Sequence, residues 1–307
     1  MQKFLLTATS AGKTVLKELD LPQVGRVTGI TSRGIFLVTD RAGIIFLSYE
    51  AYRGPLTVNL PGLPPEVTVA LVMGAALALT PGCLSARDGK YKVLLPAGSG
   101  WSALVAPLEQ ASPLPVRLAR LHSFCRLALS RKDRAGFAPV LPALLDWPGA
   151  AASPPVWDSL LAARVQNVLA LPSLLQIKAI PQVAANLGQL LGCGRGLTPS
   201  GDDLVLGLLL VANRWGAAGL PIKALARLNT EVVAAARRRT TTLSARLIEC
   251  AAQGEADERL LAAADYLFSG AGDGGKVLDE LLTWGASSGV DALVGMALVV
   301  SLFYAKL

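Results

Sequence analysis

Positions 192–203 read GCGRGLTPSGDD, the least regular stretch of the chain. Four glycines within ten residues cannot form a stable helix interior, because glycine loses more backbone freedom on folding than any other residue. Apolar segments with helical spacing lie on both sides of this stretch. We therefore predict a tight loop that leads into a helix beginning near Ser200, within a part of the chain that is otherwise helical.

The end of this loop has the features of an anion site. A helix N-terminus presents free N–H groups and the positive end of the helix dipole, and anions bind there readily. Two nucleotide-binding motifs do not fit: Leu197 stands where the dinucleotide fingerprint needs glycine, and Asp202 and Asp203 stand where a P-loop has Lys and Ser or Thr. A purely structural interpretation stays open, with Ser200 as the helix cap and the aspartates as favourable first-turn acids.

A second stretch near the C-terminus repeats the same pattern. Residues 200–207 read SGDDLVLG and residues 288–295 read SGVDALVG, so both match Ser-Gly-x-Asp-x-x-x-Gly at the start of an apolar helix. We predict two helix N-termini that face one pocket, with Asp203 and Asp291 close together. Each final glycine lies one turn beyond its aspartate and would permit close approach of another helix or a ligand. Chance similarity in a glycine-rich chain is the alternative.

Two further features have a functional and a structural interpretation. Residues 237–244 read RRRTTTLS, which offers arginine forks for an anion but also fits a basic helix C-terminus followed by an N-cap. His122, the single histidine, is interpreted as a packing or surface residue.

The first part of the chain predicts strands. Short β-branched or aromatic runs separated by turn-like sequences lie at 26–31, 34–39, 43–49, 56–60 and 90–95. Strands this short, joined by tight turns, indicate a small antiparallel sandwich or barrel. The stretch 67–79 stays open between a buried strand pair and a helix.

The pattern changes near Leu104 to helical spacing. We predict an α+β fold with a β-rich domain at 1–105, a helix and proline-rich connector at 106–155, and a mainly α-helical domain at 156–307 that carries the glycine-rich loop. The expected helices are 116–132, 157–170, 173–191, 200–216, 221–238, 241–253, 255–268, 274–285 and 289–306. Pro181 predicts a break or kink within one of them, and Pro221 fits a first helical turn.

Composition and charge exclude several classes of protein. Charged residues make up 17% of the chain, below the ~25% typical of soluble domains, which indicates extensive burial of helix against helix or partner. The only dense basic stretch, 117–134, contains one aromatic residue and has an apolar stripe, so it predicts an amphipathic helix and no nucleic-acid site. The longest apolar runs, 69–79 and 292–300, are too short to span a bilayer, and no signal peptide is evident.

The cysteines and the single histidine limit the chemistry. Four cysteines without a CxxC pair exclude zinc sites built from His and Cys, and a single histidine argues against His-dependent triads. Unpaired cysteines fit a reducing cytoplasm.

The glycine-rich loop closely resembles the GxGLTPSGDD signature of a bacterial family linked to oxamate carbamoyltransferase through its AllH-type subunit. The resemblance extends to 240–244 and to 285–291, and the order of a β-rich part followed by helices also fits. The resemblance implies one subunit of a complex that exchanges a carbamoyl group between oxalurate and phosphate, giving oxamate and carbamoyl phosphate, in purine or allantoin degradation. It implies other carbamoyltransferase subunits as partners.

The resemblance and the residue-level interpretation meet at small anionic substrates. We expect chemistry at Asp202, Asp203 and Asp291, which can accept hydrogen bonds from a carbamoyl NH2 or hold a divalent cation. The residues expected to bind substrate are Gly194, Gly196, Thr198, Ser200, Gly201, Thr241, Ser287, Ser288 and Gly289. A scaffold subunit with a structural loop, and a stand-alone metal-assisted hydrolase or lyase, are the alternatives.

Overall fold

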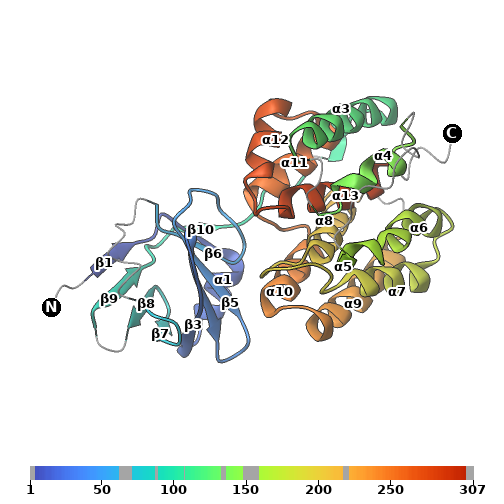
Figure 1. Ribbon diagram of the computed structural model, residues 1–307. Coiled ribbons are helices and arrows are strands. Elements are labelled where there is room, and N and C mark those ends of the chain that lie inside the picture. Colours follow the sequence, from blue (N-terminus) through green and yellow to red (C-terminus); the bar gives the residue numbers. More distant parts are fainter. Residues whose placement is uncertain are drawn as a thin grey trace. The chain divides into compact units, whose positions relative to one another are not determined.

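Strands fill the first third of the chain and helices the remainder (Figure 1). The computed structural model describes residues 4–61, 71–86, 89–106, 108–132, 136–147, 159–216 and 221–301. The chain divides into two units, residues 1–104 and 105–307, and each is described by itself. The expected α+β class, with a small β part followed by a mainly helical part, is confirmed.

The first unit is one curled sheet with a short helix. Its strands follow the spatial order β1-β9-β8-β7-β3-β4-β5-β6-β2-β10. The elements are β1 (Phe4–Thr7), β2 (Ser10–Gly12), α1 (Lys13–Leu19), β3 (Gln23–Thr31), β4 (Gly34–Thr39), β5 (Ile44–Ser48), β6 (Thr57–Asn59), β7 (Ala76–Thr80), β8 (Cys83–Ala86), β9 (Tyr91–Leu94) and β10 (Gly100–Trp101).

The five expected strands correspond to β3, β4, β5, β6 and β9. Most neighbours in the sheet pair antiparallel, as expected, but β1 with β9, β5 with β6 and β10 with β2 pair parallel. The sheet is therefore mixed. Of the ambiguous stretch 67–79, residues 67–70 lie outside the described residues, and β7 begins at Ala76.

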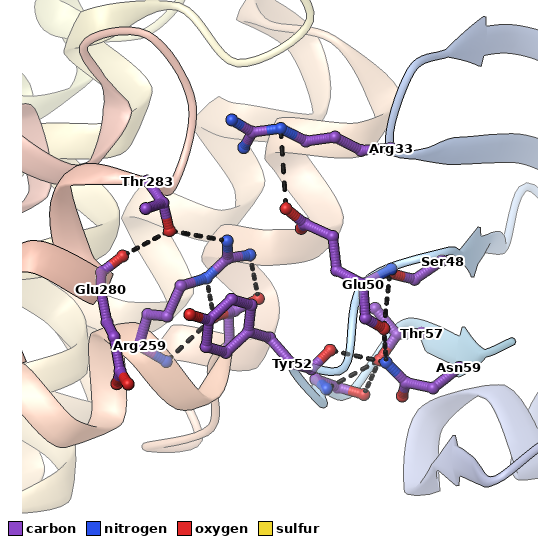
Figure 2. Close-up of polar contacts among 11 residues, drawn as sticks. Arg33, Ser48, Glu50, Tyr52, Thr57, Asn59, Arg259, Glu280 and Thr283 are labelled. Atoms are coloured by element: carbon purple, nitrogen blue, oxygen red, sulfur yellow. Dashed lines mark hydrogen bonds and ion pairs between the residues drawn. The ribbon is translucent and has the colours of Figure 1, made fainter. Parts of the chain in front are cut away.

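Alternate side chains of the strands form the core of this unit. Ile35, Leu37, Ile45 and Leu47 are fully buried on β4 and β5, and α1 adds Val15 and Leu19 to the same cluster. Asn59 holds the loop before β6, because its amide nitrogen donates to the carbonyl oxygens of Glu50 at 3.0 Å and Tyr52 at 2.7 Å (Figure 2).

The second unit consists of helices and two short 3-10 turns. The elements are η1 (Leu108–Gln110), α3 (Leu114–Lys132), η2 (Ala138–Val140), α4 (Leu141–Leu144), α5 (Ser159–Ala162), α6 (Val165–Gln176), α7 (Ile180–Leu190), α8 (Ser200–Arg214), α9 (Ile222–Arg239), α10 (Thr242–Ala251), α11 (Glu258–Ser269), α12 (Gly274–Leu282) and α13 (Ser288–Ser301).

Prolines explain where these helices differ from the expected boundaries. The predicted break at Pro181 is real: α6 ends at Gln176, and Pro181 lies in the first turn of α7, where its missing N–H costs nothing. Pro172, however, lies inside α6 where a boundary was expected. Pro221 is the N-cap of α9 and not a first-turn residue. The connector prolines at 148, 154 and 155 lie outside the described residues.

Helix α3 has the predicted apolar stripe. Leu121, Cys125 and Ala128 are fully buried. The arginines beside this stripe are less solvated than the sequence suggested, because Arg117 lies over the ring of Phe268 and Arg120 over that of Tyr266. Cation–π contacts of this kind favour the guanidinium's position on the aromatic face. His122 accepts a hydrogen bond from the indole of Trp147 at 2.8 Å, which agrees with a packing role.

Helices α11 and α12 are joined through a buried arginine. Arg259 is 4% exposed, and Asp257 accepts two hydrogen bonds from its guanidinium, each at 2.9 Å. The Thr283 hydroxyl accepts from Arg259 and donates to the carbonyl oxygen of Glu280 at 2.6 Å (Figure 2). Across the described parts of the chain, no helix is long and apolar enough to cross a membrane.

Candidate functional site

The glycine-rich loop ends at the N-terminus of α8. Pro199 is the N-cap, and its carbonyl oxygen accepts from the N–H groups of Asp202 at 2.9 Å and Asp203 at 3.2 Å. Ser200, expected at or near the cap, is the first residue of the helix. The loop itself needs glycine at Gly192 and Gly194, which have φ of 76° and 120° and where a Cβ would come within 2.5 Å and 2.6 Å of backbone atoms.

The carboxyl group of Asp202 holds the start of this loop through hydrogen bonds. One carboxyl oxygen accepts from the N–H of Gly192 at 2.7 Å, and the other accepts from the hydroxyl of Thr240. Asp202 is 1% exposed. Burial raises the pKa of Asp202 above its usual value, and the hydrogen bonds from Thr240 and Gly192 oppose this shift because they stabilise the carboxylate. Asp202 therefore connects the loop to the end of α9, and both of its oxygens already have partners.

The structure brings the two Ser-Gly-x-Asp segments side by side. Ser287 begins α13 as Pro199 begins α8: its carbonyl oxygen accepts from the N–H groups of Val290 at 3.0 Å and Asp291 at 2.9 Å. The hydroxyls of Thr198 and Ser288 lie 3.2 Å apart, and those of Ser200 and Ser287 lie 3.4 Å apart. We call residues 198–203 and 287–291 the paired N-termini.

Glycines let the two helices cross at backbone contact. A Cβ on Gly207 would lie 2.0 Å from the carbonyl oxygen of Ala292, and a Cβ on Gly295 would lie 1.9 Å from that of Leu204. Gly207 and Gly295 are equivalent positions of the repeat, as are Leu204 and Ala292. The crossing is therefore close to two-fold symmetric, as expected if the repeated glycines exist for close approach.

The aspartates of the two Ser-Gly-x-Asp segments are buried. Asp203 is 1% exposed and Asp291 is fully buried. Burial raises the pKa of Asp203 well above its usual range, and repulsion from the Asp291 carboxylate raises it further, while hydrogen bonds from the Ser288 and Thr198 hydroxyls oppose the shift. Asp291 therefore acts electrostatically on Asp203.

The two carboxyl groups have different donors. Oδ1 of Asp291 accepts from the N–H of Phe137 at 2.6 Å, and Gly136 lies so close that a Cβ there would be 2.1 Å from the same oxygen. The Oδ2 atoms of Asp203 and Asp291 are both buried and accept no hydrogen bond from the described residues.

The other proposed binding residues fall into two groups. Exposed or half-buried residues of the loop and the paired N-termini are Gly194, Gly196, Thr198 and Ser287. Buried residues are Ser200, Gly201, Ser288 and Gly289. The Thr241 hydroxyl caps α10 by accepting from Ser244 N–H and donates to the Leu197 carbonyl oxygen at 2.7 Å, so it holds the loop in place.

The first residues of the loop line a pocket. Its volume is about 380 Å³, and it is formed by Ala163, Arg164, Gln189, Leu191, Gly192, Cys193 and Gly194. The guanidinium of Arg164 supplies a positive charge there. The side-chain oxygen of Gln189 accepts from Asn167, which leaves its NH2 group as a potential donor.

The sequence did not reveal several of these partners. Gly136 and Phe137 lie 154 positions or more from Asp291, and neither residue type indicates a carboxylate contact. Thr240 belonged to a recognised candidate segment, but its bond to Asp202 was not foreseen. No motif or spacing in the sequence around Arg164 indicates that it lines a pocket. Within the described ranges, no group of three or more His, Cys, Asp and Glu side chains is arranged to hold a metal ion.

This geometry coincides with the part of the chain that is similar to a known family. Residues 190–300 match the family described as oxamate carbamoyltransferase subunit AllH. The resemblance inferred from the loop is thereby confirmed over this region, which runs from the end of α7 through the paired N-termini to the end of α13 and includes both Ser-Gly-x-Asp segments. No curated protein and no solved structure matches the chain.

Proposed function

We propose that this chain is a subunit of an oxamate carbamoyltransferase-type complex and binds a small anionic substrate at the paired N-termini. The match to the AllH family supports the association with carbamoyl transfer between oxalurate or oxamate and phosphate. The observation that carries the binding site is the contact of Thr198 with Ser288 and of Ser200 with Ser287, because it joins two helix N-termini at one point.

The chemistry of this point suits an anion. Both helix dipoles direct their positive ends toward it, and within the described chain the N–H groups of Gly196, Leu197 and Thr198 donate no hydrogen bond. The hydroxyls of Thr198 and Ser287 are half-buried and can donate to a bound carboxylate or phosphate. Fixed donors of this kind also stabilise the oxyanion that forms when a carbamoyl group is attacked.

Binding of oxamate, oxalurate, phosphate and carbamoyl phosphate to the full chain, measured by calorimetry, tests the site. We expect Thr198→Val and Ser287→Ala to weaken binding about tenfold each, since a hydrogen bond to a charged group contributes about 1.5–3 kcal/mol. Ser123→Ala is the matched control, because that hydroxyl bonds only to the Ala119 carbonyl oxygen within α3. If anion binding is lost in Arg164→Ala but unchanged in Thr198→Val and Ser287→Ala, the anion binds in the neighbouring pocket and the proposal is wrong.

A scaffold subunit is the second candidate. It is favoured by the burial of Asp202, Asp203 and Asp291, each at most 1% exposed, and by the hydrogen bonds that tie both Asp202 oxygens to Gly192 and Thr240. A carbamoyl-transfer assay with co-expressed partner subunits separates the two. If the Ser287→Ala variant assembles normally but the complex turns over more slowly, the result supports substrate binding by this chain. Unchanged turnover supports a scaffold.

A further inference from the structure

The pocket beside the start of the glycine-rich loop contains a cation without a partner. Arg164 lines this pocket, and the guanidinium of this half-buried residue forms no ion pair or hydrogen bond with any described residue. The described residues that line the pocket include no Asp or Glu, so they leave the charge of Arg164 uncompensated. A volume of about 380 Å³ is sufficient for a small molecule. We call this cavity the Arg164 pocket.

The amide of Gln189 adds an oriented donor to the Arg164 pocket. Gln189 lies in the last turn of α7 and lines the pocket. Its side-chain oxygen accepts from the Asn167 NH2 group at 2.9 Å, and this bond fixes which end of the amide carries the oxygen. The NH2 group of Gln189 is thereby left to donate. The guanidinium and the amide therefore both present donors and no acceptor to a bound molecule.

The Arg164 pocket also lies at the N-terminal end of α6. Arg164 is the N-cap of this 12-residue helix, and the N–H groups of residues 165–167 donate no hydrogen bond to the described residues. The positive end of the α6 dipole therefore adds to the charge of the guanidinium. Arg239 supplies a further cation nearby, because it donates to the carbonyl oxygen of Gly188, the residue before Gln189.

The Arg164 pocket adjoins the paired N-termini through the loop backbone. A Cβ on Gly194, which lines the pocket, would lie 2.6 Å from the backbone nitrogen of Ser200. The Gly201 N–H donates to the carbonyl oxygen of Cys193, another lining residue, at 2.8 Å. Two lining residues of the pocket thus contact the first turn of α8 directly.

We propose that the Arg164 pocket is a second anion site, which binds a small oxyanion, a phosphate or a carboxylate, through the guanidinium and the Gln189 NH2 group. Two oxygens on one atom match the parallel N–H groups of a guanidinium, and a further contact to the amide fixes the orientation. The pocket stands on its own residues. Its role beside the paired N-termini rests on the proposed function: it holds the second reactant of a two-substrate transfer next to the first.

Calorimetric titration of the full chain with inorganic phosphate, and separately with oxamate, tests this site. Gln189→Glu is nearly isosteric, keeps an acceptor for Asn167 and places a negative charge in the pocket. We expect Gln189→Glu and Arg164→Ala each to weaken binding at this site by at least about tenfold, the effect of losing one hydrogen bond to a charged group. Dependence seen with phosphate alone assigns a phosphate site, and dependence seen with oxamate alone assigns a carboxylate site.

Gln182→Glu is the matched control. It makes the same substitution at an exposed position of α7 that is not among the residues lining the pocket, so it should leave binding unchanged. Because Gln189 is also exposed, its replacement should not disturb the fold, and urea unfolding of each variant checks this. Equal weakening by Gln182→Glu and Gln189→Glu would show a general effect of charge and would overturn the inference.

Failure of this inference is distinguishable from failure of the proposed function. If Thr198→Val and Ser287→Ala weaken one binding event while Arg164→Ala and Gln189→Glu weaken another, both sites exist. If only the two pocket variants weaken binding, the Arg164 pocket is an anion site and the proposed site at the paired N-termini is wrong. If only the two hydroxyl variants do so, or if the wild type binds neither phosphate nor oxamate, the Arg164 pocket is not an anion site.

Discussion

Gly207 and Gly295 each lie against the backbone of the other's helix. A Cβ at either position would come within 2.0 Å of a carbonyl oxygen, that of Ala292 for Gly207 and that of Leu204 for Gly295. This reciprocal contact lets α8 and α13 approach so closely that their first turns share hydroxyl contacts. The glycine pair therefore positions the paired N-termini.

Gly207→Ala should destabilise the protein by about 1–3 kcal/mol or more, because the added methyl group forces two buried backbones apart. Alanine ordinarily stabilises a helix relative to glycine, so the expected sign is opposite to intrinsic propensity. Gly188→Ala in α7 is the matched control: its nearest neighbour would be the Ala235 Cβ at 3.9 Å, an ordinary contact. Chemical denaturation measures both, and a neutral Gly207→Ala would show that the crossing is looser than described.

Local signals explain the part of the fold that could be predicted. The strands β3, β4 and β5 were recognisable because turn residues separate short β-branched runs. Both the turn residues and the β-branched runs are local signals that extend over only a few positions. The parallel pairing of β1 with β9 could not be foreseen, since it joins Phe4 to Tyr91 and depends on long-range packing. Pro172 within α6 shows tertiary contacts overriding a local boundary signal.

The candidate site was predictable only where the sequence repeats itself. Two copies of Ser-Gly-x-Asp-x-x-x-Gly indicated that Asp203 and Asp291 would approach each other, because equivalent segments often pack in equivalent ways. Phe137 could not be found in this manner. It contributes a backbone N–H, and any residue type except proline has that group. The burial of Asp203 was likewise invisible, since a first-turn aspartate is usually solvated.

The contact between Gly136 and Asp291 gives a second stability prediction. Gly136→Ala should destabilise the protein for two reasons: φ is +51°, and the Cβ would lie 2.1 Å from a carboxyl oxygen of the buried Asp291. Gly216→Ala isolates the first reason, because Gly216 has a φ of +55° and open space around it. Left-handed backbone alone costs about 1–2 kcal/mol. We expect Gly136→Ala to cost at least about 1 kcal/mol more than Gly216→Ala in urea unfolding; equal costs would mean that Asp291 is free to move.

The attachment of the glycine-rich loop through Asp202 can be measured by a double-mutant cycle. Asp202→Ala leaves the Gly192 N–H and the Thr240 hydroxyl without their acceptor and should cost about 1–3 kcal/mol. Thr240→Val removes one donor. Because both changes break the same bond, the double variant should be less destabilised than the sum of the two, by about 0.5 kcal/mol or more. Additive effects would indicate that water replaces the Thr240 contact.

Breaking the ion pair at the end of α8 should destabilise the protein much more than breaking a similar pair on the surface. Arg214 is 7% exposed and forms two hydrogen bonds to Asp265, at 2.7 Å and 2.8 Å, while the Trp215 indole donates to the same carboxylate at 3.0 Å. Arg214→Ala leaves the Asp265 carboxylate without its cation and with only the Trp215 indole as a donor among the described residues. Removing one partner of a buried ion pair costs about 3–5 kcal/mol of stability. Since the Asp265 side chain is 24% exposed, we expect the lower end of that range.

Arg227→Ala supplies the comparison for this last prediction. Arg227 pairs with Glu231 at 2.7 Å, the same distance as in the buried pair, but its side chain is 61% exposed. Solvated pairs of this spacing contribute about 0.3–0.5 kcal/mol, so Arg227→Ala should barely shift the unfolding midpoint. Asp265→Asn added to Arg214→Ala should restore part of the lost stability, because it removes the stranded charge. If the two arginine variants are equally stable, or if Asp265→Asn gives no recovery, desolvation is not what sets the cost at Arg214.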